Sequence, residues 1–172
     1  MSLLWATAAL SSDQQEALEK VRALPGEPDR PNMVSGEPVK RLMAEHGIVV
    51  HASAPHIDAE IQPQYEGSAS FYPHEELHTS QNHLWKPALE NYIKHGHEHL
   101  CHPDYEHEDE TSETEDDHHE HYHIPYRPQI YTHGDNDWID EGHHRILASR
   151  MLGEHFEAEH GVTLEPDDGK WD

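Results

Sequence analysis

The segment between Lys94 and Arg127 limits what this chain can fold into more than any other part. It contains nine histidines and a dense run of aspartate and glutamate, without a single lysine or arginine. Carboxylates of like charge repel one another, and so polar a composition offers little apolar surface to bury. We therefore expect residues 95–126 to form a mobile, solvated insertion, with the folded part of the chain on either side.

The composition of the whole chain points to one folded domain of modest size. Its 172 residues carry 35 acidic side chains against 11 lysines and arginines, a formal charge of −24, and 34% of them are hydrophobic. Typical globular chains are ~45–50% apolar. We expect an N-terminal helical arm and linker over 1–47, one domain over 48–164 that contains the insertion, and a polar tail over 165–172.

The same arithmetic disfavours several classes of protein. No stretch approaches the ~18 apolar residues of a membrane helix, so no membrane partner is expected. The first residues offer a short apolar run without a basic start, which argues against an export signal. The single Cys101 cannot form an intramolecular disulfide, which favours a cytoplasmic location. The charge makes direct binding to duplex DNA doubtful, because phosphates are neutralised by lysine and arginine.

The hydrophobic pattern outside the insertion alternates between short helices and short strands. Residues 25–38 read as a linker, and 52–70 show no clear period. Ser12 is the expected cap of the first helix. Helices are expected over 13–24, 39–46, 87–95 and 146–152, and strands over 48–50, 71–77, 129–132, 137–140 and 155–160.

The most informative stretch is the passage from the strand at 137–140 into the helix that follows. A glycine at the mouth of a helix, here Gly142, lets backbone N–H groups face an anion, usually a phosphate. Arg145 adds a planar cation suited to phosphate oxygens, and His143 and His144 can donate hydrogen bonds to them. Taken alone, this spacing is equally typical of an ordinary helix start with surface histidines.

The run Trp138–Gly153, centred on Gly142-His143-His144-Arg145, resembles the second conserved motif of the ParB/sulfiredoxin superfamily. In that family a hairpin strand runs into a glycine-containing signature, and a helix follows. The chain resembles in particular the short ParB-like nuclease domain proteins of actinobacterial phages. The resemblance implies an α/β (α+β) fold with a small mixed sheet, and an origin in a phage or its bacterial host.

The rest of the resemblance lies upstream, and it spans about residues 70–160 around the insertion. Leu77–Gln81, the helix at 87–95 and the strand at 129–132 come in the order that the family shows. Among its branches, sulfiredoxins carry their catalytic cysteine where this chain has His143, so sulfinate reduction is improbable. The partition proteins bind CTP through a similar box but also carry a DNA-binding and a dimerisation part, for which this chain has no room.

The resemblance leaves two further branches of the family as alternatives. The family's serine kinases use an upstream glutamate as base, a position that Glu75 or Glu76 would fill here. The nuclease branch is supported by the customary family name and opposed by the net charge.

The histidines of the insertion offer a separate hypothesis. Alternating imidazoles suit Zn²⁺ or another transition metal, and weak adventitious binding is the alternative. The candidate ligands are His97, His99, His102, His119, His121 and His123.

These observations favour a domain that binds a nucleotide or another phosphorylated small molecule at Gly142–Arg145. The expected chemistry is Mg²⁺-assisted nucleotide hydrolysis or phosphoryl transfer, with Arg145 stabilising charge and His143 or His144 assisting. Asp140 or Glu141 would hold the Mg²⁺ or accept a proton. One alternative is a non-enzymatic acidic protein that occupies a DNA-binding protein as a DNA mimic or docks other proteins. The other is a nuclease.

Overall fold

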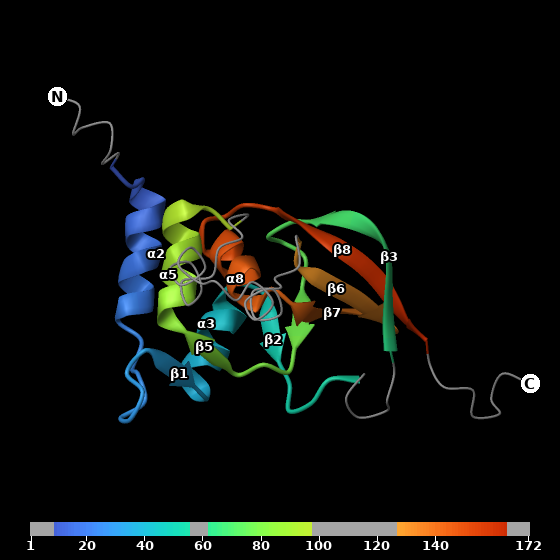
Figure 1. The fold of residues 1–172 in the computed structure, drawn as a ribbon, viewed down its shortest axis with the longest axis horizontal. Coiled ribbons are helices and arrows are strands. Elements are labelled where there is room, and N and C mark those ends of the chain that lie inside the picture. The colour runs from blue at the N-terminus through green and yellow to red at the C-terminus, as the bar shows by residue number, and fades with distance from the viewer. Residues whose placement is uncertain (1–8, 56–61, 98–126, 165–172) are drawn as a thin grey trace, which may run out of the picture.

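The computed structural model describes residues 9–55, 62–97 and 127–164, which form a six-stranded mixed sheet, a separate two-stranded sheet and four helices (Figure 1). The helices are α2 (Ser12–Arg22), α3 (Glu37–Glu45), α5 (Lys86–His95) and α8 (His143–Met151). The strands of the sheet, in their order across it, are β2 (Ile48–Val50), β4 (Leu77–Thr79), β7 (Asn136–Glu141), β6 (Gln129–His133), β8 (Phe156–Leu164) and β3 (Gln62–Phe71). The expected mixed α and β class is confirmed.

Three neighbouring strands of the sheet, β2, β4 and β7, run parallel. Their carboxyl ends therefore meet at one edge, where open α/β sheets usually bind their ligands. The chain leaves β7 directly into α8, and it leaves β4 through β5 (His83–Trp85) into α5. The starts of two helices are thus brought to the same edge of the sheet.

The helices share one hydrophobic core with the sheet. In Figure 1 they gather at the left, where α5 lies against both α8 and α2. Leu18 and Val21 of α2 belong to the same buried cluster as Ile93 of α5 and Ile146 of α8. The segment expected to be an arm is thus packed into the common core. Its helix is capped by Ser11 instead of Ser12, because the Ser11 hydroxyl accepts from the Gln14 amide and the Gln14 side chain bonds back.

The prediction of a linker over 25–38 was wrong for its last residues, which contain a strand. β1 (Met33–Ser35) pairs antiparallel with β5, so Val34 lies opposite Leu84 and both are fully buried. A three-residue strand gives too short a pattern to read from sequence. Its partner lies about fifty residues away.

Residues 52–70 were expected to show no regular structure, yet they include most of β3. This strand lies at the edge of the sheet and pairs only with β8 among the described strands, with an irregularity between Tyr65 and Gly67. An edge strand needs little alternation between apolar and polar residues, and the irregularity displaces the alternation that is present. The sequence of β3 therefore shows no period that indicates a strand.

The strand expected over 71–77 was also wrong. Phe71 ends β3, the backbone then turns so that the Glu75 amide donates to Tyr72 O, and Leu77 begins β4. The other predicted elements are confirmed with shifts of a few residues at their ends. They are the helices at 13–24, 39–46, 87–95 and 146–152, the strand at 48–50, the hairpin of 129–132 and 137–140, and the strand at 155–160.

Two further expectations concern residues that the structure does not describe. Most of the insertion expected over 95–126, and the tail over 165–172, lie outside the described residues. Within the described residues, none of the helices has the length and apolar character needed to cross a bilayer.

Arg150 fastens α8 to two turns at the opposite edge of the sheet. Its Nη1 donates to the His46 carbonyl at 2.8 Å and its Nη2 to the Glu75 carbonyl at 2.7 Å. The residue is only 4% exposed. The two turns precede β2 and β4, so one guanidinium sets the position of α8 relative to both parallel strands.

We expect Arg150→Met to lower the free energy of unfolding by about 2–4 kcal/mol, because it removes a buried charged donor from two partly buried carbonyls. Urea unfolding measures the change. Arg41→Met, at an exposed arginine of α3, is the control and should change stability by less than about 0.5 kcal/mol. Equal stability of the two variants would show that the fastening is not energetically important.

Candidate functional site

Gly142 joins β7 to α8 in a conformation that favours glycine. Its φ is 93° and its ψ 27°, in the left-handed region. A Cβ added there would lie 2.7 Å from the Cβ of Pro128, a contact that no side chain tolerates. The first hydrogen bond of the helix runs from the Ile146 amide to the Gly142 carbonyl. The amides of the three residues before Ile146 lie ahead of this first helical hydrogen bond.

His143 is bound to the end of β4. Its Nε2 lies 2.6 Å from the Thr79 Oγ1, and that hydroxyl also accepts from the Gln81 amide at 3.1 Å. Burial, together with smaller effects of the nearby His144 and His83, lowers the pKa of His143 from its ordinary 6.5 to about 3. The ring is therefore neutral at pH 7. Its contact with Thr79 positions the start of α8 relative to the end of β4.

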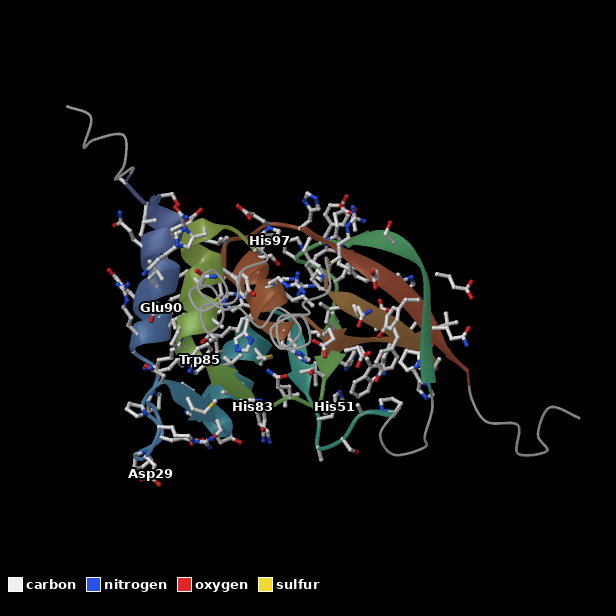
Figure 2. All side chains as sticks on the ribbon, in the orientation of Figure 1. Asp29, His51, His83, Trp85, Glu90 and His97 are labelled. Atoms are coloured by element: carbon white, nitrogen blue, oxygen red, sulfur yellow. The ribbon has the colours of Figure 1, made fainter. Side chains whose placement is uncertain are left out.

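His144 joins the starts of two helices. Its Nε2 accepts a hydrogen bond from the Trp85 amide at 3.0 Å. Trp85 is the N-cap residue of α5, which has no side-chain cap of its own. Figure 2 labels Trp85 there and His83 in the strand just before it. Because Nε2 is an acceptor, the neutral ring carries its proton on Nδ1.

Arg145 places a buried cation in the first turn of α8. The residue is 3% exposed, and burial lowers the pKa of its guanidinium, while Tyr92 and Glu141 oppose the shift. An arginine remains charged even so. The start of α8 thus combines a helix N-terminus with a permanent positive charge.

Asp140 and Glu141 are consecutive residues at the end of β7, where its pairing with β6 becomes irregular. The Asp140 Oδ2 accepts from the Tyr65 hydroxyl at 2.7 Å, and burial, together with this carboxylate, raises the pKa of Tyr65. Burial also raises the pKa of Glu141, as does the charge of Asp140, while Arg145 opposes the shift. Glu141 is therefore the carboxylate that shares the Arg145 side.

The histidine ligands expected in the insertion are mostly not placed. His99, His102, His119, His121 and His123 lie outside the described residues. His97 lies within them, where its Nε2 is 3.1 Å from the Glu154 Oε1. Among the residues that can be described, no three histidine, cysteine or acidic side chains come together to hold a metal.

The sequence analysis did not identify several residues as part of the site. They are Thr79, His83, Trp85 and Pro128, which contact or influence the Gly142–Arg145 box from elsewhere in the chain. Leu77–Gln81 was noticed as part of the family resemblance, but nothing in its spacing predicts a contact with a helix 64 residues away. Only the topology of the parallel strands brings these residues together.

Comparison with protein-family models, with curated proteins and with solved structures finds no match for this chain.

The lowered pKa of His143 has a consequence for stability. The unfolded chain takes up a proton below pH 6.5, whereas the folded chain does not until about pH 3, so stability is lost as the pH falls through this window. We expect a contribution of up to about 1.4 kcal/mol per pH unit from this residue. Urea unfolding of His143→Gln should show a pH dependence that is shallower by this amount.

The control for the pH experiment is His74→Gln, which removes an exposed imidazole from elsewhere on the surface. It should keep the steeper dependence of the wild type. An unchanged slope in His143→Gln would mean that the ring is protonated in the folded state.

Gly142→Ala should destabilise the chain by two separable effects. The left-handed backbone costs an alanine about 1–2 kcal/mol, and the contact with Pro128 adds to it. Gly134→Ala is a matched control, because Gly134 also has a positive φ, 64°, but has open space around its Cβ. Urea unfolding of both variants measures the difference, and identical losses would show that Pro128 yields without cost.

Proposed function

We propose that this chain binds the phosphate group of a nucleotide or another phosphorylated small molecule where α5 and α8 begin. The single observation that carries the proposal is the bond between the Trp85 amide and the His144 Nε2. It joins two helix N-termini, and the dipole of each helix favours an anion at that end.

The charges around this point support the same ligand. The chain carries a formal charge of −24, yet the cation Arg145 and three imidazoles, of His83, His143 and His144, surround the start of α8. Besides burial, the neighbouring His144 and His83 lower the pKa of His143 when no anion is present. A bound phosphate would reverse this effect, so binding is expected to be coupled to proton uptake.

The proposed chemistry is Mg²⁺-assisted hydrolysis or phosphoryl transfer. Glu141 is the carboxylate placed to hold a hydrated Mg²⁺ or to accept a proton, because it lies on the side of Arg145. Asp140 bonds to Tyr65 instead, and we assign it to that contact. Arg145 and the first-turn amides would stabilise charge on the phosphate. The resemblance of Trp138–Gly153 to the ParB/sulfiredoxin motif agrees with this proposal.

Calorimetric titration of the full chain with CTP, ATP, ADP, GTP and inorganic phosphate, with and without Mg²⁺, tests the proposal. We expect at least one nucleotide to bind, and to bind more tightly at pH about 6 than at pH about 8. Arg145→Lys keeps the charge but loses the planar fork, and should weaken binding about tenfold or more, a loss of about 1.4 kcal/mol.

His74→Gln and Arg41→Lys are the controls, because both residues are exposed and neither is part of the site. Circular dichroism should show that each variant is folded. Absence of binding heat with every ligand, from folded wild-type protein, would sink the proposal and leave the acidic docking protein as the better explanation of the charge.

A further inference from the structure

A second group of polar side chains lies on the face of the sheet opposite to α8. Thr79 points toward α8, where it contacts His143, so the preceding residue of the strand, His78, points to the other face. There it meets His51, which directly follows β2 and is labelled in Figure 2. The His51 Nε2 and the His78 Nδ1 are 2.9 Å apart, with the ring planes tilted by 33°.

A carboxylate determines which nitrogen of His78 carries the proton. The Glu76 Oε1 lies 3.3 Å from the His78 Nε2, so this nitrogen is the donor to the carboxylate. The Nδ1 is then left with its lone pair, directed at His51. A histidine that binds a metal through one nitrogen nearly always donates from the other to such a carboxylate or carbonyl.

Trp138 forms the wall beside both rings. Its ring centre lies 4.7 Å from that of His51 and 5.5 Å from that of His78. The residue is 6% exposed, and its Nε1 has no hydrogen-bond partner within the described part of the chain. A buried N–H without a partner is costly, and a water or ligand oxygen at this place would satisfy it.

We infer that His51 and His78 bind a transition metal ion, of the Zn²⁺, Co²⁺, Ni²⁺ or Cu²⁺ class, through Nε2 and Nδ1. Two tetrahedral nitrogen ligands at ~2.0–2.1 Å from a metal are roughly 3.3 Å apart. The pair therefore has to open by a few tenths of an ångström, and each ring has to turn until both nitrogens point at the metal. The proton on the His51 Nε2 moves to its Nδ1, and both rings stay neutral. The remaining positions go to water or to a ligand oxygen, one of which can accept from the Trp138 Nε1.

This site differs from the ones predicted from the sequence. It uses no histidine of the insertion, and its two imidazoles favour a softer ion than the Mg²⁺ proposed at Glu141. The His51 amide donates to the Thr79 carbonyl at 2.8 Å, which places the metal at the same edge of the sheet as the phosphate site. Metal binding here does not depend on the proposed function.

Fluorescence of Trp138 reports on the site, because Ni²⁺ and Co²⁺ quench an indole that lies close to them. The wild-type chain and the Trp138→Phe variant are each titrated with Ni²⁺ alone. The difference between their fluorescence curves is the signal of Trp138. We expect this signal to be quenched in the wild type and to lose its quenching in His51→Gln. His74→Gln is the matched control and should keep it, while any binding to the insertion is common to all variants.

A measurement on the unaltered chain keeps the inference testable should a variant fail to fold. Nitrogen resonances of the histidine rings, recorded with and without Zn²⁺, should shift at the His51 Nε2 and the His78 Nδ1. Equal quenching of Trp138 in the wild type and in folded His51→Gln, or unchanged resonances of the pair with Zn²⁺ in excess, would overturn it.

Discussion

The bond from the Trp85 amide to His144 is the interaction on which the arrangement of the candidate site depends. Neither α5 nor α8 has a side-chain hydrogen bond at its cap; in α5 the Lys86 amide donates to the Asn32 carbonyl instead, and Pro87 has no N–H. A ring nitrogen from the first turn of one helix satisfies an amide at the start of the other. This places the two helix starts next to each other at the carboxyl edge of the parallel strands.

The sequence predicted the parts of the site that are local and missed those that are joined by the fold. Gly142, the histidines and Arg145 follow one another in the chain, and a glycine before a helical pattern indicates a helix start. That Thr79 would hold His143 and that Trp85 would bond to His144 depends on β4 pairing with β7 and on α5 packing against α8. No periodicity encodes such pairings.

The elements that the sequence missed share a physical cause. β1 and β3 are stabilised mainly by pairing with one distant partner, β5 and β8 respectively, and their residues do not alternate between apolar and polar. β7 and α8, which are packed on several sides, carry clear patterns and were found. β4 lies between β2 and β7 and was missed as well, because three residues are too few to show a pattern.

A neutral imidazole is the recurring component of both proposed sites, and this follows from the charge of the chain. The chain has a formal charge of −24 and few basic residues, so it repels anions at long range. A phosphate site therefore has to depend on hydrogen-bond donors that act at short range. Neutral rings supply such donors without a desolvation cost for a full charge, and they also supply lone pairs for a metal. β4 connects the two sites, since His78 faces the imidazole pair and Thr79 faces α8.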